Sequence, residues 1–74
     1  MLFYVFFKDF KNNKLIQVFE KPFWGKEIAL ENLIKFLLKI YEKIEDIYIK
    51  EDEDIIEINI PNIGLFYITK RRDV

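Results

Sequence analysis

The stretch Gly25–Ile44, GKEIALENLIKFLLKIYEKI, carries the clearest periodicity in this chain. With Leu33 at the centre of a helical wheel, apolar side chains gather on one side and charged side chains on the other, as in a helix that packs on a core. The apolar side holds Ala29, Leu30, Leu33, Leu37, Ile40, Tyr41 and Ile44, and the charged side holds Glu31, Lys35, Lys39 and Glu42. Ile28 and Leu38 fall nearer the charged side. We therefore predict one helix over residues 25–44, lying across one face of a sheet.

The ends of this helix are marked by a change in residue type. Gly25 is expected to begin it, because Pro22 keeps the preceding chain out of helical conformation. Glu31 stands four residues before Lys35, an orientation that stabilises a helix by about 0.3 kcal/mol. No glycine ends the helix; instead, the apolar period changes from that of a helix to that of a strand near residues 45–46.

Short strands with alternating apolar residues are predicted on both sides of the helix. Their ranges are residues 2–8, 15–20, 46–50, 55–60 and 65–70. The first two strands are expected to form a hairpin around residues 9–13, where Asn12 and Asn13 tolerate a positive φ. The predicted fold is a single α+β domain over residues 1–74. It has a single five-stranded, mainly antiparallel sheet with one helix packed on one face, in the order β-β-α-β-β-β.

One helix can cover only one face of such a sheet. To the helix side we assign Ile16, Val18, Ile47, Ile49, Ile56, Ile58, Ile60, Phe66 and Ile68. The opposite face, called the outer face below, is expected to carry Leu15, Phe19, Tyr48, Lys50, Ile55, Glu57, Leu65 and Tyr67. The strand over residues 2–8 is apolar on both sides, and the sequence leaves open which set faces the helix. Because exposed apolar patches of a few hundred Å² usually mark interfaces, we predict that the outer face binds another protein or a second copy.

The composition excludes most catalytic chemistry. The chain has no His, Cys or Ser and a single Thr, Thr69. Most nucleophile–base pairs are built from those residue types. The only two glycines, Gly25 and Gly64, lie too far apart to form a phosphate-binding loop. We therefore predict a protein that is not an enzyme and that needs no cofactor.

The apolar start of the chain, MLFYVFF, does not predict a targeting segment. It lacks the basic region and the small-residue cleavage site of a signal peptide. No apolar run approaches the roughly 18 residues of a membrane span. The expected location is the cytoplasm of a cell or of a host cell.

Acidic residues concentrate between residues 42 and 57, where eight carboxylates face two lysines, a net charge of −6. Glu51, Asp52, Glu53 and Asp54 form its centre. One interpretation is a surface that mimics nucleic-acid phosphate or meets a basic partner; the other is a solvated turn that blocks edge-to-edge aggregation. The run lacks the alternating Asp spacing of a calcium loop, so we expect no metal site.

The N-terminal half is locally basic, with a net charge of +3 over residues 8–26. Its lysines are Lys8, Lys11, Lys14, Lys21 and Lys26, and the C-terminal tail adds Lys70, Arg71 and Arg72. Aromatic residues on a sheet beside a basic rim would suit stacked bases. However, the whole chain carries a net charge of −1. Nucleic-acid binding is therefore the alternative function.

Phe23 and Trp24 follow Pro22 and precede the helix. They form either a plug that closes the core or an exposed anchor for a partner. We favour the core for Trp24, because large aromatic side chains dominate core burial.

Together these features predict a small non-enzymatic protein–protein interaction module, with a homodimer as the expected assembly. The predicted partner-binding residues are Tyr48, Tyr67, Leu65, Phe19, Trp24, Glu51, Asp52, Glu53 and Asp54. In size, charge segregation and lack of catalytic residues, the chain resembles compact α+β proteins of viruses and mobile elements, including inhibitors of host machinery. That resemblance implies a regulator or inhibitor.

Overall fold

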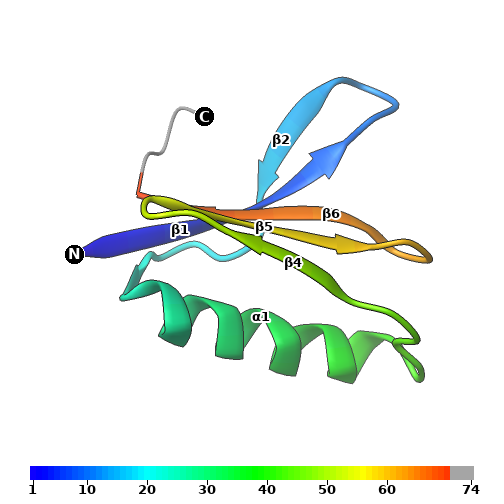
Figure 1. Ribbon diagram of the computed structural model, residues 1–74. Coiled ribbons are helices and arrows are strands. Elements are labelled where there is room, and N and C mark those ends of the chain that lie inside the picture. The colour runs from blue at the N-terminus through cyan, green and yellow to red at the C-terminus, as the bar shows by residue number, and fades with distance from the viewer. Residues whose placement is uncertain (71–74) are drawn as a thin grey trace.

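One helix lies beneath a twisted antiparallel sheet in the computed structural model, which describes residues 1–70 (Figure 1). The elements are β1 (Leu2–Asp9), β2 (Lys14–Gln17), β3 (Phe23–Trp24), α1 (Lys26–Ile40), β4 (Tyr48–Glu51), β5 (Ile55–Ile60) and β6 (Gly64–Thr69). The strand order is β2-β1-β6-β5-β4, with the short β3 attached to β1, and neighbouring strands run antiparallel. The predicted α+β class, with one helix on one face of a mainly antiparallel sheet, is confirmed.

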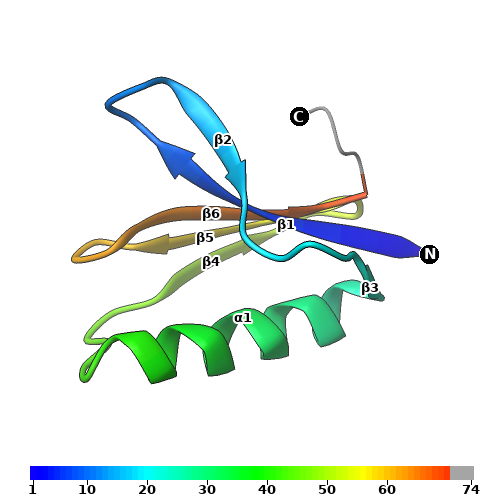
Figure 2. The same cartoon turned by 180° about the vertical axis from the view of Figure 1, so that it is seen from behind.

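β1 is an inner strand because both of its faces are apolar. Its C-terminal half pairs with β2 on one side and β6 on the other, and its N-terminal end pairs with β3. Figure 2 shows the chain leaving β2 and running along β1 to β3, just before α1. The sequence missed β3, because two residues are too few to show an alternating pattern.

The core lies between α1 and the sheet. Its buried members are Phe3, Val5, Ala29, Leu33, Leu37, Ile56, Ile58, Ile60, Phe66 and Ile68, with Val18 half-buried against them. Phe3 and Val5 therefore decide which side of β1 meets the helix. The assignments to the helix side hold for β5 and β6. Three other residues expected in this core, Ile16, Ile47 and Ile49, are instead exposed.

The helix is shorter than predicted. It begins after Gly25 (φ 103°) as expected, and Glu31 and Lys35 form the expected ion pair at 3.1 Å. It ends at Ile40 rather than at residue 44. Its 15 residues span about 22 Å, less than the roughly 27 Å of the eight-residue β1. Ile44 instead packs back against the core.

Two turns require a positive φ. Asn13 (φ 53°) closes the β1–β2 hairpin, as predicted from its tolerance of this conformation. Gly64 (φ 151°) begins β6, and a Cβ atom there would lie 2.5 Å from the ring of Phe7. Gly64 thus makes room for an aromatic ring on the helix side of the sheet.

Candidate functional site

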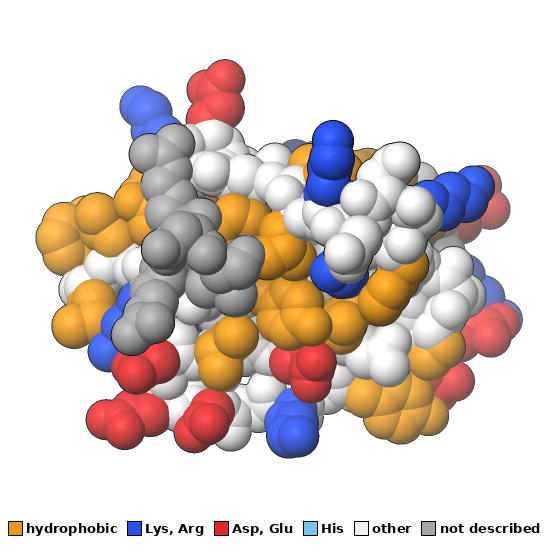
Figure 3. Space-filling model, turned by 90° about the horizontal axis from the view of Figure 1, so that it is seen from above, with side chains coloured by type: hydrophobic (Ala, Val, Ile, Leu, Met, Phe, Trp, Pro, Cys, Tyr) orange, Lys and Arg blue, Asp and Glu red, His pale blue; other side chains and the backbone are white. Residues whose placement is uncertain are grey.

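The outer face is assembled across all five main strands, as predicted. The register places Leu15, Lys8, Leu65, Asn59 and Tyr48 in one row, and Gln17, Phe6, Tyr67, Glu57 and Lys50 in the next. Figure 3 shows this face with apolar side chains at its centre and charged side chains around its rim. Directly opposite residues of antiparallel strands point to the same side, so these rows contain the predicted outer residues Leu65, Tyr67 and Tyr48.

The centre of the outer face is less open than its composition suggests. Phe6 is buried there, and Leu15, Leu65 and Tyr67 are half-buried. Figure 1 shows β2 and the end of β1 rising away from the helix on this side, so the face is curved. A hollow of about 250 Å³ remains, lined by Lys50, Asp52, Ile55, Glu57 and Tyr67. Burial, and then the neighbouring Glu57 carboxylate, raise the pKa of the Tyr67 phenol above its ordinary value.

Exposed apolar side chains also gather in the segment we call the β4 edge, residues 47–51. Tyr48 is 60% exposed, Ile49 50% and Ile47 39%. β4 is the last strand of the sheet, and the backbone of α1 comes closest to β1, β3 and β6, so Ile49 on the helix side of β4 stays half-exposed. Sequence reasoning missed Ile47 and Ile49 as surface residues, because their alternation matches that of a core strand.

The β4 edge also carries backbone groups that β5 does not use. The Asp52 N–H donates to the Ile55 carbonyl at 2.8 Å, which fixes the alternation of hydrogen bonds along this hairpin. Tyr48 and Lys50 therefore direct their N–H and C=O groups toward β5, since bonded pairs in an antiparallel ladder recur at every second residue. The backbone groups of Ile49 and Glu51 point away from the sheet, and Ile47, just before β4, is not paired with β5. Such a row of free donors and acceptors can bind an additional strand.

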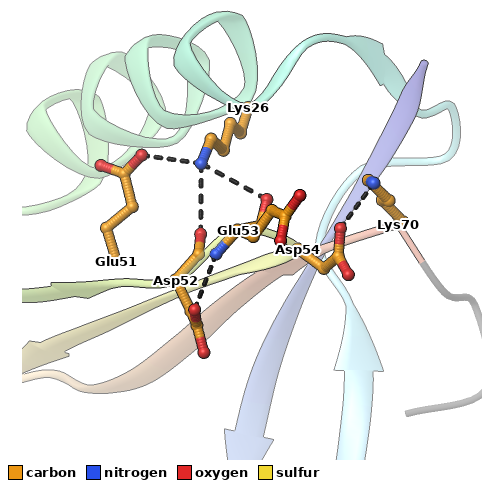
Figure 4. A network of polar contacts seen from close by, with 6 residues as sticks. All are labelled: Lys26, Glu51, Asp52, Glu53, Asp54 and Lys70. Atoms are coloured by element: carbon orange, nitrogen blue, oxygen red, sulfur yellow. Dashed lines mark hydrogen bonds and ion pairs between the residues drawn. The ribbon is translucent and has the colours of Figure 1, made fainter.

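The acidic turn after β4 is held by two lysines (Figure 4). Lys26 Nζ lies 2.8 Å from a Glu51 carboxylate oxygen and donates to the carbonyls of Asp52 and Glu53 at 3.1 and 3.4 Å. Lys70 Nζ lies 2.5 Å from Asp54 Oδ1. The hydrogen bond to Glu51 is the largest cause of the raised pKa of Lys26. The turn is thus partly neutralised by its own chain, and Lys26 fastens the start of α1 to the end of β4.

Two predicted site residues are placed differently from expectation. Phe19 does not belong to the outer face: its ring contacts Phe23 and Phe36, with centroids 5.1 and 5.3 Å apart, on the helix side. The chain crosses to that side after β2 ends at Gln17, whose side chain donates to the Phe19 carbonyl at 2.7 Å. The expectation of a core Trp24 is wrong, since this side chain is 70% exposed. Successive strand residues face opposite sides, so half-buried Phe23 turns Trp24 outward.

The basic residues do not form one free stripe. Lys26 and Lys70 are held in the ion pairs with Glu51 and Asp54, and Lys8 donates to the Asn13 side chain at 3.0 Å. The predicted contribution of residues 71–72 lies outside the described residues. Two of the lysines counted along the sequence are thus neutralised by the acidic turn, whereas Lys8, Lys11 and Lys14 lie in the β1–β2 hairpin.

Comparison with known proteins finds no matching family model, curated protein or solved structure. Within residues 1–70, no group of acidic side chains is arranged to hold a metal ion. The helix of this described region is not long and apolar enough to cross a membrane.

Proposed function

We propose that this chain is a non-enzymatic protein-binding module and that the β4 edge is its binding surface. The partner adds a strand to the sheet, so that its backbone bonds to Ile47, Ile49 and Glu51. Addition of a strand to an open sheet edge is a recurrent mode of recognition, in which backbone bonds give affinity and alternating side chains give specificity. We place this activity in the cytoplasm, as the sequence predicts.

One observation supports this proposal above the others: the β4 edge joins exposed apolar side chains to free backbone groups. Tyr48 is 60% exposed on the outer face, and Ile49 is 50% exposed on the helix side. Tyrosine is enriched among the residues that dominate binding energy at protein interfaces. The half-buried outer face offers fewer exposed apolar groups, and the acidic turn supplies charge beside the edge rather than a separate site.

Site-specific photo-crosslinking tests the proposal in cells that express the chain. A photoreactive phenylalanine derivative replaces Tyr48, and the matched control carries it in place of Phe10, which is 68% exposed in the β1–β2 turn. Protein adducts are expected at position 48 and not at position 10. Equal yields at the two positions, or none at position 48, would overturn the proposal.

A further inference from the structure

We infer that the strand added to the β4 edge is β4 of a second copy, paired antiparallel about a two-fold axis that passes beside Tyr48. This inference rests on the proposed function and names its partner. A two-fold contact uses the same patch on both subunits, so the patch must be complementary to itself. The β4 edge meets this requirement in its backbone, its apolar side chains and its charges.

The backbone restricts how two such edges can pair. Ile49 and Glu51 have outward hydrogen-bonding groups, and in the proposed pairing the strand extends back through residues 45–47, so that Ile47 joins them and bonded pairs form among these three residues of the two copies. In addition, directly opposite side chains must share a face of the sheet. Three registers that bond at least two of these residues in each copy satisfy both conditions: they place Tyr48, Ile49 or Lys50 opposite itself, and the last sets two lysines against each other.

Charge selects the register centred on Tyr48. There, Lys50 of each copy faces Asp46 of the other copy, and Ile47 faces Ile49. Among the described residues, neither Lys50 nor Asp46 forms an ion pair within its own chain, so both are available. Opposite charges across two strands stabilise their pairing.

The register centred on Ile49 is less favourable. It places Asp46 opposite Asp52 of the second copy, and Ile47 opposite Glu51. The register centred on Tyr48 has one like-charge pair, Glu45 with Glu51, but each partner already has a lysine. Glu51 lies 2.8 Å from Lys26, and Glu45 lies 3.5 Å from Lys43.

The helix leaves room for this dimer. β4 is the last strand of the sheet and the backbone of α1 comes closest to β1, β3 and β6, which leaves Ile47 and Ile49 exposed beside the edge. A two-fold axis perpendicular to the joined sheet places both helices on the same side. There, Ile47 and Ile49 of both copies form a four-residue apolar cluster that covers side chains now 39% and 50% exposed. Tyr48 pairs with its copy on the outer face.

Charge reversal tests the partner and the register together. Sedimentation over a range of concentrations should show a reversible dimer of the wild-type chain. Lys50→Glu and Asp46→Lys should each weaken it about tenfold, since each creates two like-charge contacts. The double variant should restore the dimer. Lys11→Glu, the same change in the distant β1–β2 turn, is the control and should leave dimerisation unchanged.

The alternatives give different results. Under the register centred on Ile49, Asp46→Lys would strengthen the dimer, because it would face Asp52. A chain that stays monomeric at all concentrations overturns the inference. Continued growth beyond the dimer would indicate a head-to-tail contact between the β4 edge and β2, which also overturns it.

Single cysteines test the register directly, because the chain has none of its own. Under mild oxidation, Tyr48→Cys should form a disulfide-linked dimer, since opposite Cβ atoms of a non-bonded antiparallel pair lie close to disulfide distance. Ile49→Cys is the matched control and should cross-link more slowly. The reverse order would overturn the register centred on Tyr48.

These outcomes are separable from failure of the proposed function. Suppose that the adducts at position 48 contain only other proteins and that sedimentation gives the mass of a monomer. The β4 edge would then stand as a binding surface, and pairing of two copies would be excluded. Absence of any adduct would reject both.

Discussion

β4 and β5 have nearly the same sequence pattern and opposite surroundings. Each region alternates isoleucine toward the helix side, yet Ile58 of β5 is fully buried, whereas Ile49 directly opposite it on β4 is 50% exposed. β5 has a strand on both sides, whereas β4 has a strand on one side only and lies farther from the backbone of α1 than β1, β3 and β6 do. The comparison teaches that alternation determines which face a side chain occupies, whereas the place of the strand in the sheet determines whether that face is covered.

The largest expected effect is the difference in unfolding free energy between alanine variants of these two isoleucines. Ile58→Ala should lower the free energy of unfolding by about 2–5 kcal/mol, because it leaves a cavity in the core. Ile49→Ala should lower it by about 1 kcal/mol or less, because half of that side chain already meets water. Urea denaturation at low protein concentration, where a dimer dissociates, measures both. Equal losses would contradict the comparison.

The turn that joins β5 to β6 gives a second test of how tightly the helix side of the sheet is packed. Gly64→Ala combines an unfavourable φ of 151° with a Cβ 2.5 Å from the Phe7 ring, so we expect a loss above about 1–3 kcal/mol, the range for backbone strain alone. Gly25→Ala is the matched control: its φ is 103°, but a Cβ there meets nothing within 4 Å. Thermal unfolding of the two variants should therefore show the larger loss for Gly64→Ala. Similar losses would mean that the Phe7 ring moves aside freely.

The fastening of β4 to α1 should depend on pH. The folded chain raises the pKa of Lys26, chiefly through the hydrogen bond to Glu51. A lysine with a raised folded pKa contributes its full stabilisation below the unfolded-state pKa and loses it as pH rises through the folded value. The difference in urea midpoint between wild type and Lys26→Met should thus be constant near neutral pH and shrink in strong alkali.

Glu51→Gln provides the control for that measurement. It removes the negative partner and keeps the shape of the side chain, so it should reproduce part of the neutral-pH effect of Lys26→Met, because Lys26 still donates to the carbonyls of Asp52 and Glu53. A difference that stays constant at every pH would mean that Lys26 acts through packing of its methylene groups rather than through its charge.

The smallest effect is expected at an exposed residue that sequence reasoning placed in the core. Trp24→Ala should change the free energy of unfolding by no more than about 0.5 kcal/mol, because the side chain is 70% exposed. Phe23→Ala, one residue earlier, should cost more, since that ring contacts Phe19. Urea denaturation followed by circular dichroism compares the two, because neither result then depends on tryptophan fluorescence. A larger loss for Trp24→Ala would restore the original assignment.

Local rules predicted much of this fold because they depend on near neighbours in the chain. The helical period predicted α1, alternation predicted the main strands, and the tolerance of asparagine for positive φ predicted the turn at Asn13. The predictions were wrong where the outcome depends on distant contacts. Phe19 turns to the helix side to meet Phe23 and Phe36, and no pattern around residue 19 specifies that contact.

The candidate site was predicted in part. Tyr48 was named as a binding residue and is exposed, but it was grouped with Leu65 and Tyr67, which are half-buried. The isoleucines beside it were assigned to the core. Their exposure requires knowing that β4 is the last strand and that the helix crosses beneath other strands, and neither fact is encoded in the spacing of residues 47–51.

By itself, the amino-acid sequence determined the types of element, which side chains of a strand share a face and the lack of the usual catalytic residues, because backbone geometry and side-chain chemistry are local properties. The tertiary structure alone decided the strand order, the pairing of Lys26 with Glu51 and the opening of the β4 edge. These depend on how one short helix is shared among strands far apart in the chain: it buries the helix-side isoleucines of β5 with the core and leaves Ile49 of β4 half-exposed.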